Sequence, residues 1–461
     1  MRIKTTLFSV ATLFLLFSML FYSCSGNLNN DDDCQKLLET IPEEVIFITV
    51  ADIKSLNNKI GEESTDGQIV LKGDLSKDLK TLFIDADSGV KQSVIVLYAV
   101  GKSIAITGFI DNEDIFKSVI EEQRNEQWIL LDEFQECGNT IIRGNQFWIV
   151  ENKEDFYDSM ICFNERKTAF SNEVVADLLP LDKDVKYFIN YNKVLSMMLK
   201  DMPLETSMAI GVMKDMLIKD LAYAVGGINF EKDVVSFDYN CLTTKGEKAK
   251  LTLPLSTIDS KILNRLPSNS DMVVALGLTE ELWQTLNAAF EPFVISSMQP
   301  FELQIYKKSM EIVTNINKGI ALGLKTREYK ETGEFKEEAT LLLQTENETS
   351  AENILIGVRT LFPTIEDDKN IKINSSDDVV EFTVGVSDEE KGMPQITELF
   401  DGKYMGLYIK GNLLNKELKT DLFEHIEITC EDLSSATGRL YLNISDSGNA
   451  LSALIEMLEN Q

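Results

Sequence analysis

The sequence predicts an α+β fold in which antiparallel sheets are faced by helices, built from repeated strand–helix and hairpin–helix units in two pseudo-equivalent halves, residues 41–258 and 259–461. The first observation is a recurring unit in which a turn precedes a short apolar run and an amphipathic stretch follows it. The second is a pair of alternating runs followed by a capped helix, which occurs once in each half. The third is spacing, because the interval from Pro42 to Pro180 nearly equals that from Pro267 to Asp401.

The strand–helix unit occurs four times. Proline lies in the turn of the first three copies, at Pro42, Pro180 and Pro267, where its fixed φ and missing N–H are tolerated. The fourth copy lacks the proline. The expected strands lie within residues 41–48, 185–190, 271–276 and 399–407, and the expected helices lie at residues 53–60, 193–199, 280–286 and 413–418.

The hairpin–helix unit is predicted by alternating polarity. Residues 93–109 alternate on either side of Gly101, a pattern typical of a β-hairpin. Asp111 and Asn112 can cap a helix whose Ile115, Phe116, Val119 and Ile120 share one face. In the second half, residues 319–325 and 338–344 form the expected hairpin, and Ser350 is the expected helix cap.

Residues 1–23 have the features of a secretory signal peptide. Arg2 and Lys4 give a positive start, residues 7–20 are mostly apolar, and Ser23-Cys24 closes the segment. The segment resembles a bacterial lipoprotein signal, which implies lipidation of Cys24, with palmitate among the acyl chains. An ordinary cleaved signal with a chance cysteine is the alternative. Residues 24–40 are then expected to be a lipidated flexible tether, since residues 25–33 have almost no apolar content.

The whole pattern resembles a family of uncharacterised Bacteroidota lipoproteins of unknown function. Members of that family share the lipidated start, an Ile/Leu-Pro opening near residue 40 and repeated hairpin–helix units. The resemblance implies a lipid-anchored location at the outer membrane, on its periplasmic face or at the cell surface. It carries no catalytic residue to this chain.

Composition limits the partners. The chain has a formal net charge of −31 and is 44% hydrophobic, so we expect a globular protein that binds neither nucleic acid nor anionic headgroups. The expected partners are the membrane, through the lipid, and an envelope protein or a glycan. No CxxC pair is present, which gives zinc no support; the other five cysteines are Cys34, Cys137, Cys162, Cys241 and Cys430.

Three patterns that suggest chemistry are incomplete. The single histidine, His425, lies in a strand-like run without a nucleophile motif, so we expect a structural role. Ser88 and Lys91 form an SxxK match without the companion SDN and KTG elements. Asp85 and Asp87 have the spacing of a calcium turn but lack the rest of the loop. We therefore predict no catalytic, cofactor-binding or metal-binding residues and no cofactor.

Two apolar features suggest either core or partner contacts. Six methionines lie between residues 197 and 216, and residues 288–301 form an apolar stretch with Pro292 and Pro300 that either docks in its own core or presents a binding edge. Asp158-Ser159 matches a short acceptor pattern for O-glycosylation, and the sequence leaves the modification of Ser159 open.

Together these features predict a membrane-anchored, exported lipoprotein that acts as a non-enzymatic binding or scaffolding module in the cell envelope. The first alternative is a carboxylate-dependent hydrolase that acts on a polysaccharide, since 75 acidic residues make facing carboxylates possible. The second alternative is a structural spacer without a ligand.

Overall fold

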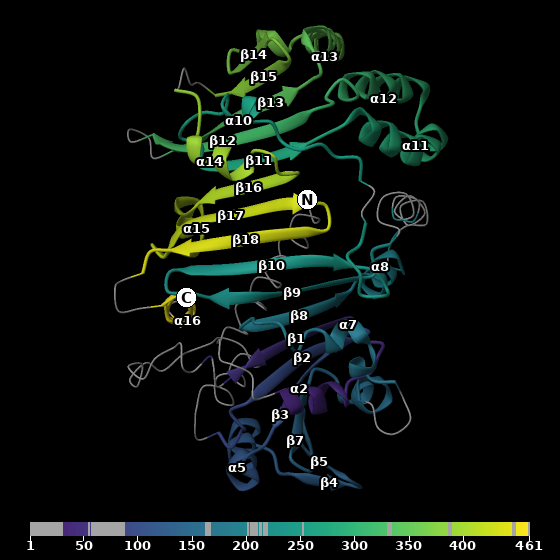
Figure 1. Cartoon of the computed structure of the whole chain (residues 1–461), viewed down its shortest axis with the longest axis vertical. Helices are drawn as coiled ribbons and strands as arrows, with labels where there is room; N and C mark the ends of the chain where they lie inside the picture. Colours follow the sequence, from purple (N-terminus) through teal and green to yellow (C-terminus); the bar gives the residue numbers. More distant parts are fainter. Residues whose placement is uncertain are drawn as a thin grey trace. The chain divides into compact units, whose positions relative to one another are not determined.

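The computed structural model describes residues 31–53, 88–161, 167–200, 220–250, 253–329, 334–385, 390–444 and 449–459, with the isolated residues 56, 202, 211 and 214 (Figure 1). The chain forms two compact units. The first unit comprises Met1–Met197, Ala222–Glu247 and Leu442–Gln461, and the second comprises Met198–Leu221 and Lys248–Tyr441.

The first unit is an antiparallel array of strands with helices packed on it. Pairing places its described strands in the order β4–β5–β6–β7–β3–β2–β1–β8–β9–β10. The strands are β1 (Phe47–Asp52), β2 (Val94–Val100), β3 (Ser103–Phe109), β4 (Ile129–Leu131), β5 (Phe134–Cys137), β6 (Thr140–Arg143), β7 (Gln146–Val150), β8 (Val185–Asn190), β9 (Tyr223–Phe230) and β10 (Val234–Leu242).

The described helices that lie in or begin in this unit are α2 (Asp31–Leu38), α5 (Glu113–Arg124), α6 (Lys153–Asp155), the π-helix η1 (Phe156–Met160), η2 (Ala169–Ser171), α7 (Glu173–Ala176), α8 (Tyr191–Lys200) and α16 (Ala450–Glu459).

Helix α2 lies inside the segment that composition predicts to be a tether. Its Cys34, Leu37 and Leu38 are at most 2% exposed, and they share the first unit's hydrophobic core with strands β1 and β2. The spacing of these residues puts them on one helical face. Asp33 on the same helix forms an ion pair with Lys91, at 2.5 Å. Residues 31–38 are therefore part of the folded body.

The second unit is also an antiparallel array, in the order β14–β15–β13–β12–β11–β16–β17, with β18 beside β17 (Figure 1). Its described strands are β11 (Met272–Gly277), β12 (Gly319–Tyr329), β13 (Glu334–Gln344), β14 (Ile371–Ser376), β15 (Val379–Val384), β16 (Met405–Lys410), β17 (Phe423–Asp432) and β18 (Ser435–Leu442).

The helices described in the second unit are α10 (Ser260–Leu263), α11 (Glu280–Ser297), α12 (Pro300–Val313), α13 (Glu348–Leu361), η3 (Ile365–Asp367), α14 (Pro394–Phe400) and α15 (Gly411–Leu418). Two hydrophobic clusters lie in this unit: one includes residues of α10 and α14, and the other includes residues of α13. Helix α14 thus has a buried face, which fixes its position next to β16.

Several local predictions are confirmed. Strands β2 and β3 pair across the turn at Gly101, which has a φ of +61°. Asn112 caps α5 through a bond from the Ile115 N–H to its Oδ1, at 3.2 Å. The predicted cap at Ser350 is wrong, because α13 begins earlier and the side chain of Asn347 accepts the N–H of Ser350.

The predicted fold class, with antiparallel sheets in two pseudo-equivalent halves of repeated units, is wrong. Among the described residues, 18 strands belong to one antiparallel sheet. Alternating and apolar runs identify strands and local hairpins, but the strand edge that each one pairs with depends on residues far apart in the chain. For that reason, recurring local patterns do not determine whether the strands of this chain form one sheet or two.

Candidate functional site

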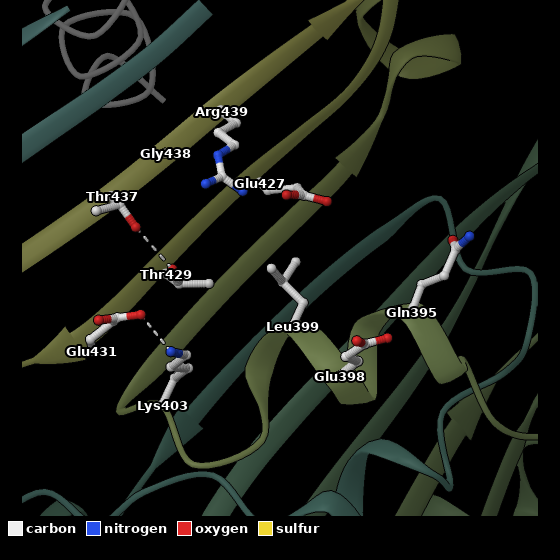
Figure 2. Close-up of a pocket in the computed structure, with 10 residues that line it drawn as sticks. All are labelled: Gln395, Glu398, Leu399, Lys403, Glu427, Thr429, Glu431, Thr437, Gly438 and Arg439. Carbon is white, nitrogen blue, oxygen red and sulfur yellow. Dashed lines mark hydrogen bonds and ion pairs between the residues drawn. The ribbon is translucent and has the colours of Figure 1, made fainter. Parts of the chain in front are cut away.

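A pocket of about 400 Å³ lies in the second unit, between α14 and the strands β17 and β18 (Figure 2). It is lined by Gln395, Glu398 and Leu399 of α14, Lys403 of the following loop, Glu427, Thr429 and Glu431 of β17, and Thr437, Gly438 and Arg439 of β18.

Helix α14 forms one wall of the pocket. Pro394 occupies its first turn, where a missing N–H leaves no bond unmade, and Ile396 and Phe400 are buried on its inner face. The ring of Phe400 lies against Gly406 of β16, and a Cβ at that position would be 2.4 Å from Phe400 Cγ. This close approach leaves the exposed Glu398 on the pocket side of the helix.

Strands β17 and β18 form the other wall. Because side chains alternate along a strand, Glu427, Thr429 and Glu431 share one face. Thr429 Oγ1 lies 3.2 Å from Thr437 Oγ1 on β18, so both hydroxyls lie on the pocket face. Arg439 lies two residues beyond Thr437 and shares this face (Figure 2).

The two basic residues of the pocket differ in their contacts. Lys403 Nζ is 2.6 Å from Glu431 Oε1, and the hydrogen bond from Lys403 lowers the pKa of the Glu431 carboxyl. Arg439 is exposed and makes no hydrogen bond or ion pair with any described residue of the chain. Figure 2 shows its guanidinium at the same end of the pocket as Glu427. The pocket therefore contains one cation that a ligand can approach.

His425 lies next to the pocket on β17. Its ring stacks on Tyr441 of β18, with centroids 4.1 Å apart, and lies 5.5 Å from the ring of Tyr408. His425 Nε2 is 3.2 Å from Glu427 Oε1, and the Tyr441 hydroxyl donates to Glu427 Oε2 at 3.4 Å. Burial, and then the charge of Glu427, raise the pKa of Tyr408. These contacts orient the Glu427 carboxylate at the edge of the pocket.

Ser88 and Lys91 of the SxxK match are not arranged as a nucleophile and its base. Ser88 is 1% exposed, and the amine of Lys91 pairs with Asp33 on α2. Gly89 between them has a φ of +76°, and a Cβ there would lie 2.5 Å from the Asn112 carbonyl. This stretch is a tight turn. Asp85 and Asp87 lie outside the described residues.

Four cysteines lie in the described part of the chain. Cys34, Cys137 and Cys241 are buried and Cys430 is half-buried. Burial is also the largest cause of the raised pKa of Cys137. Cys24 and Cys162 lie outside the described residues. In the described parts of the chain, no group of three or more His, Cys, Asp or Glu residues is placed to hold a metal ion.

The apolar stretch at residues 288–301 spans the end of α11 and the start of α12. Ile295, Met298 and Phe301 are 51%, 38% and 71% exposed, so this part presents apolar side chains at the surface. Of the methionine cluster, Met198 is 53% exposed, and most of the others lie outside the described residues. Ser159 is exposed on η1.

The pocket was not predicted from the sequence. One signal was present, because polar residues occupy every second position from Glu427 to Glu431. The opposite wall is formed by α14, which is distant in sequence and carries no matching pattern. Phe400 packs α14 on Gly406 of β16, and β16 pairs with β17 of the other wall, so long-range packing brings the two walls together.

In the parts of the chain that are described, none of the helices has the length and apolar character needed to cross a membrane. Comparison of the sequence and the structure with protein-family models, curated proteins and solved structures gives no match.

Proposed function

We propose that the protein is exported, anchored to the outer membrane by a lipid on Cys24, and acts in the cell envelope as a non-enzymatic binding module. The anchor is supported by the charged start, the apolar run at residues 7–20 and the cysteine that follows. The resemblance to Bacteroidota lipoproteins of unknown function supports the same location, on the periplasmic face or at the cell surface.

The ligand site of this module is the pocket beside α14. The observation that carries the proposal is Arg439, an exposed guanidinium without an ionic partner among the described residues, in a chain whose net charge is −31. An arginine fork fits a carboxylate with two parallel hydrogen bonds. The ligand therefore carries a carboxylate.

The other lining groups favour a peptide segment of an envelope protein. Glu398 and Glu427 can accept hydrogen bonds from ligand N–H groups, and the hydroxyls of Thr429 and Thr437 can both donate and accept. The ten lining residues include no aromatic ring. Sugar rings usually stack on such rings, so the lining supports a glycan less than a peptide.

Binding of short synthetic peptides tests this function. Calorimetric titration would compare peptides that end in a free carboxylate with the same peptides ending in a carboxamide. We expect the carboxylate forms to bind and Arg439→Gln to weaken them by about 10- to 100-fold, the effect of losing a charged hydrogen bond.

Arg359→Gln is the matched control, because Arg359 is exposed on α13 of the same unit and does not line the pocket. It should leave binding unchanged. Equal binding of carboxylate and carboxamide peptides, or equal losses in the two arginine variants, would contradict the site.

A further inference from the structure

Strand β4 exposes three consecutive aliphatic residues. Ile129, Leu130 and Leu131 are 61%, 73% and 46% exposed. Side chains alternate along a strand, so apolar groups are exposed on both of its faces. Among the described residues β4 pairs with β5 alone, which leaves its outer edge open. Such a run is unusual on a surface that faces only water.

The hairpin that carries these residues is held in place by specific contacts. Asp132 in its turn has a φ of +50°, and Glu133 forms an ion pair with Arg143 at 2.6 Å. The Arg143 guanidinium also lies 5.8 Å from the ring centroid of Phe134. The aliphatic residues are therefore presented on an ordered edge.

The base of the hairpin has groups that suit a lipid–water boundary. The half-buried Trp128 precedes β4, and its indole N–H donates to the Lys117 carbonyl at 3.2 Å. The Lys117 amine lies 6.0 Å from the centroid of the Trp128 ring. Tryptophan and lysine both combine an apolar body with a polar end, which suits them to this boundary.

Strand register places the hairpin near the N-terminal part of the fold. Leu131 pairs with Phe134, Phe134 contacts Arg143, and Arg143 pairs with Gln146. Three strand spacings of about 4.8 Å put Leu131 roughly 14 Å from Gln146. Gln146 Nε2 donates to Thr40 Oγ1 at 3.0 Å, and Thr40 follows α2 closely in the chain.

Helix α2 is the first described element after Cys24. Its eight residues extend about 12 Å, and the interval from Cys24 to Asp31 spans at most roughly 25 Å. A bilayer that holds a lipid on Cys24 lies within reach of β4.

We propose that the β4 edge, Ile129–Leu131, docks on the surface of the bilayer that holds the anchor and places its aliphatic side chains at the acyl boundary. This inference rests on the proposed lipidation of Cys24. The surface is zwitterionic phospholipid, because Asp132 and Glu133 in the turn and the net charge of −31 disfavour anionic headgroups. A lipid anchor gains stability from a second membrane contact.

Quenching of tryptophan fluorescence by brominated phosphatidylcholine tests the docking. The acylated full chain is reconstituted in vesicles of this lipid, and flotation measures the bound fraction separately. We expect quenching that Trp128→Phe removes and that Ile129→Ser with Leu130→Ser reduces by about half or more, since apolar burial drives interfacial contact. Flotation should not change, because the anchor remains.

Ile295→Ser with Phe301→Ser, at exposed apolar sites of the second unit, is the matched control and should leave quenching unchanged. Quenching that is absent, or that is insensitive to the β4 changes while the protein floats, would overturn the docking and leave the anchor standing. Failure to float would overturn both proposals. A dimer of the chain that the β4 changes dissociate, with unchanged quenching, would assign the edge to a second copy instead.

Discussion

Gly406 on β16 lies directly against the ring of Phe400 on α14, so close that a Cβ on the glycine would stand 2.4 Å from Phe400 Cγ. The Phe400 ring fills the space between helix and strand because Gly406 carries no side chain of its own. This contact sets the distance of α14 from the sheet and therefore the width of the pocket, since Glu398 and Leu399 lie on the same helix as Phe400.

Gly406→Ala should therefore destabilise the protein and disturb the pocket. The added methyl group overpacks a buried contact, for which we expect a loss of about 1–3 kcal/mol in the free energy of unfolding. Urea unfolding measures this loss. Gly319→Ala on β12 is the control, because the nearest atom to its Cβ is at an ordinary 3.4 Å. Equal losses at the two positions would show that the Phe400 contact is not special.

The β17–β18 turn predicts a dependence of stability on pH. Burial raises the pKa of Asp432, but hydrogen bonds from Lys248, Ser434 and Ser435 outweigh it and hold this pKa below its ordinary value. A depressed folded pKa contributes stability above the unfolded value of about 3.9, and this stability is lost as pH falls through the folded pKa.

Asp432→Asn should accordingly lower the free energy of unfolding at pH 7, by at most about 1 kcal/mol because the pair with Lys248 is partly exposed. Below about pH 4 the difference from the natural chain should shrink. Urea unfolding at pH 7, 5 and 3 measures both effects. A difference that stays constant or grows towards low pH would contradict this role of Asp432.

Glu398 and Glu427 on opposite walls allow a direct test of the hydrolase alternative. Hydrolysis of a glycosidic bond needs two carboxylates across a cleft. We expect the purified protein to release no reducing ends from envelope polysaccharides, and Glu398→Gln and Glu427→Gln to leave that result unchanged. Hydrolysis that either change abolishes would favour the enzyme over the binding module.

Local structure was predictable where neighbouring residues decide it. The alternation around Gly101 and the cap at Asn112 depend on residues a few positions apart, and both predictions are confirmed. Helix α2 shows the limit of composition. Three aspartates at residues 31–33 indicated a solvated segment, although Cys34, Leu37 and Leu38 had helical spacing and lie in the core.

Long-range pairing was not predictable. Strand β1 pairs with β8 in a register that sets Ile48 opposite Phe188, and no local pattern links those two residues. The pocket has the same origin, because Lys403 and Glu431 meet only once β16 and β17 are paired. Local patterns therefore predicted individual strands and helices. They predicted neither the assembly of the strands into one sheet nor the pocket.

Membrane fractionation of cells that carry the natural chain or Cys24→Ser, followed by intact-mass measurement of the recovered protein, tests the anchored location most directly. We predict that the natural chain sediments with outer membranes, begins at Cys24 and carries the added mass of a diacylglycerol thioether. Cys24→Ser should lose the membrane fraction and the added mass. A natural chain recovered from the soluble fraction without acyl mass, or unchanged sedimentation of Cys24→Ser, would contradict the anchor.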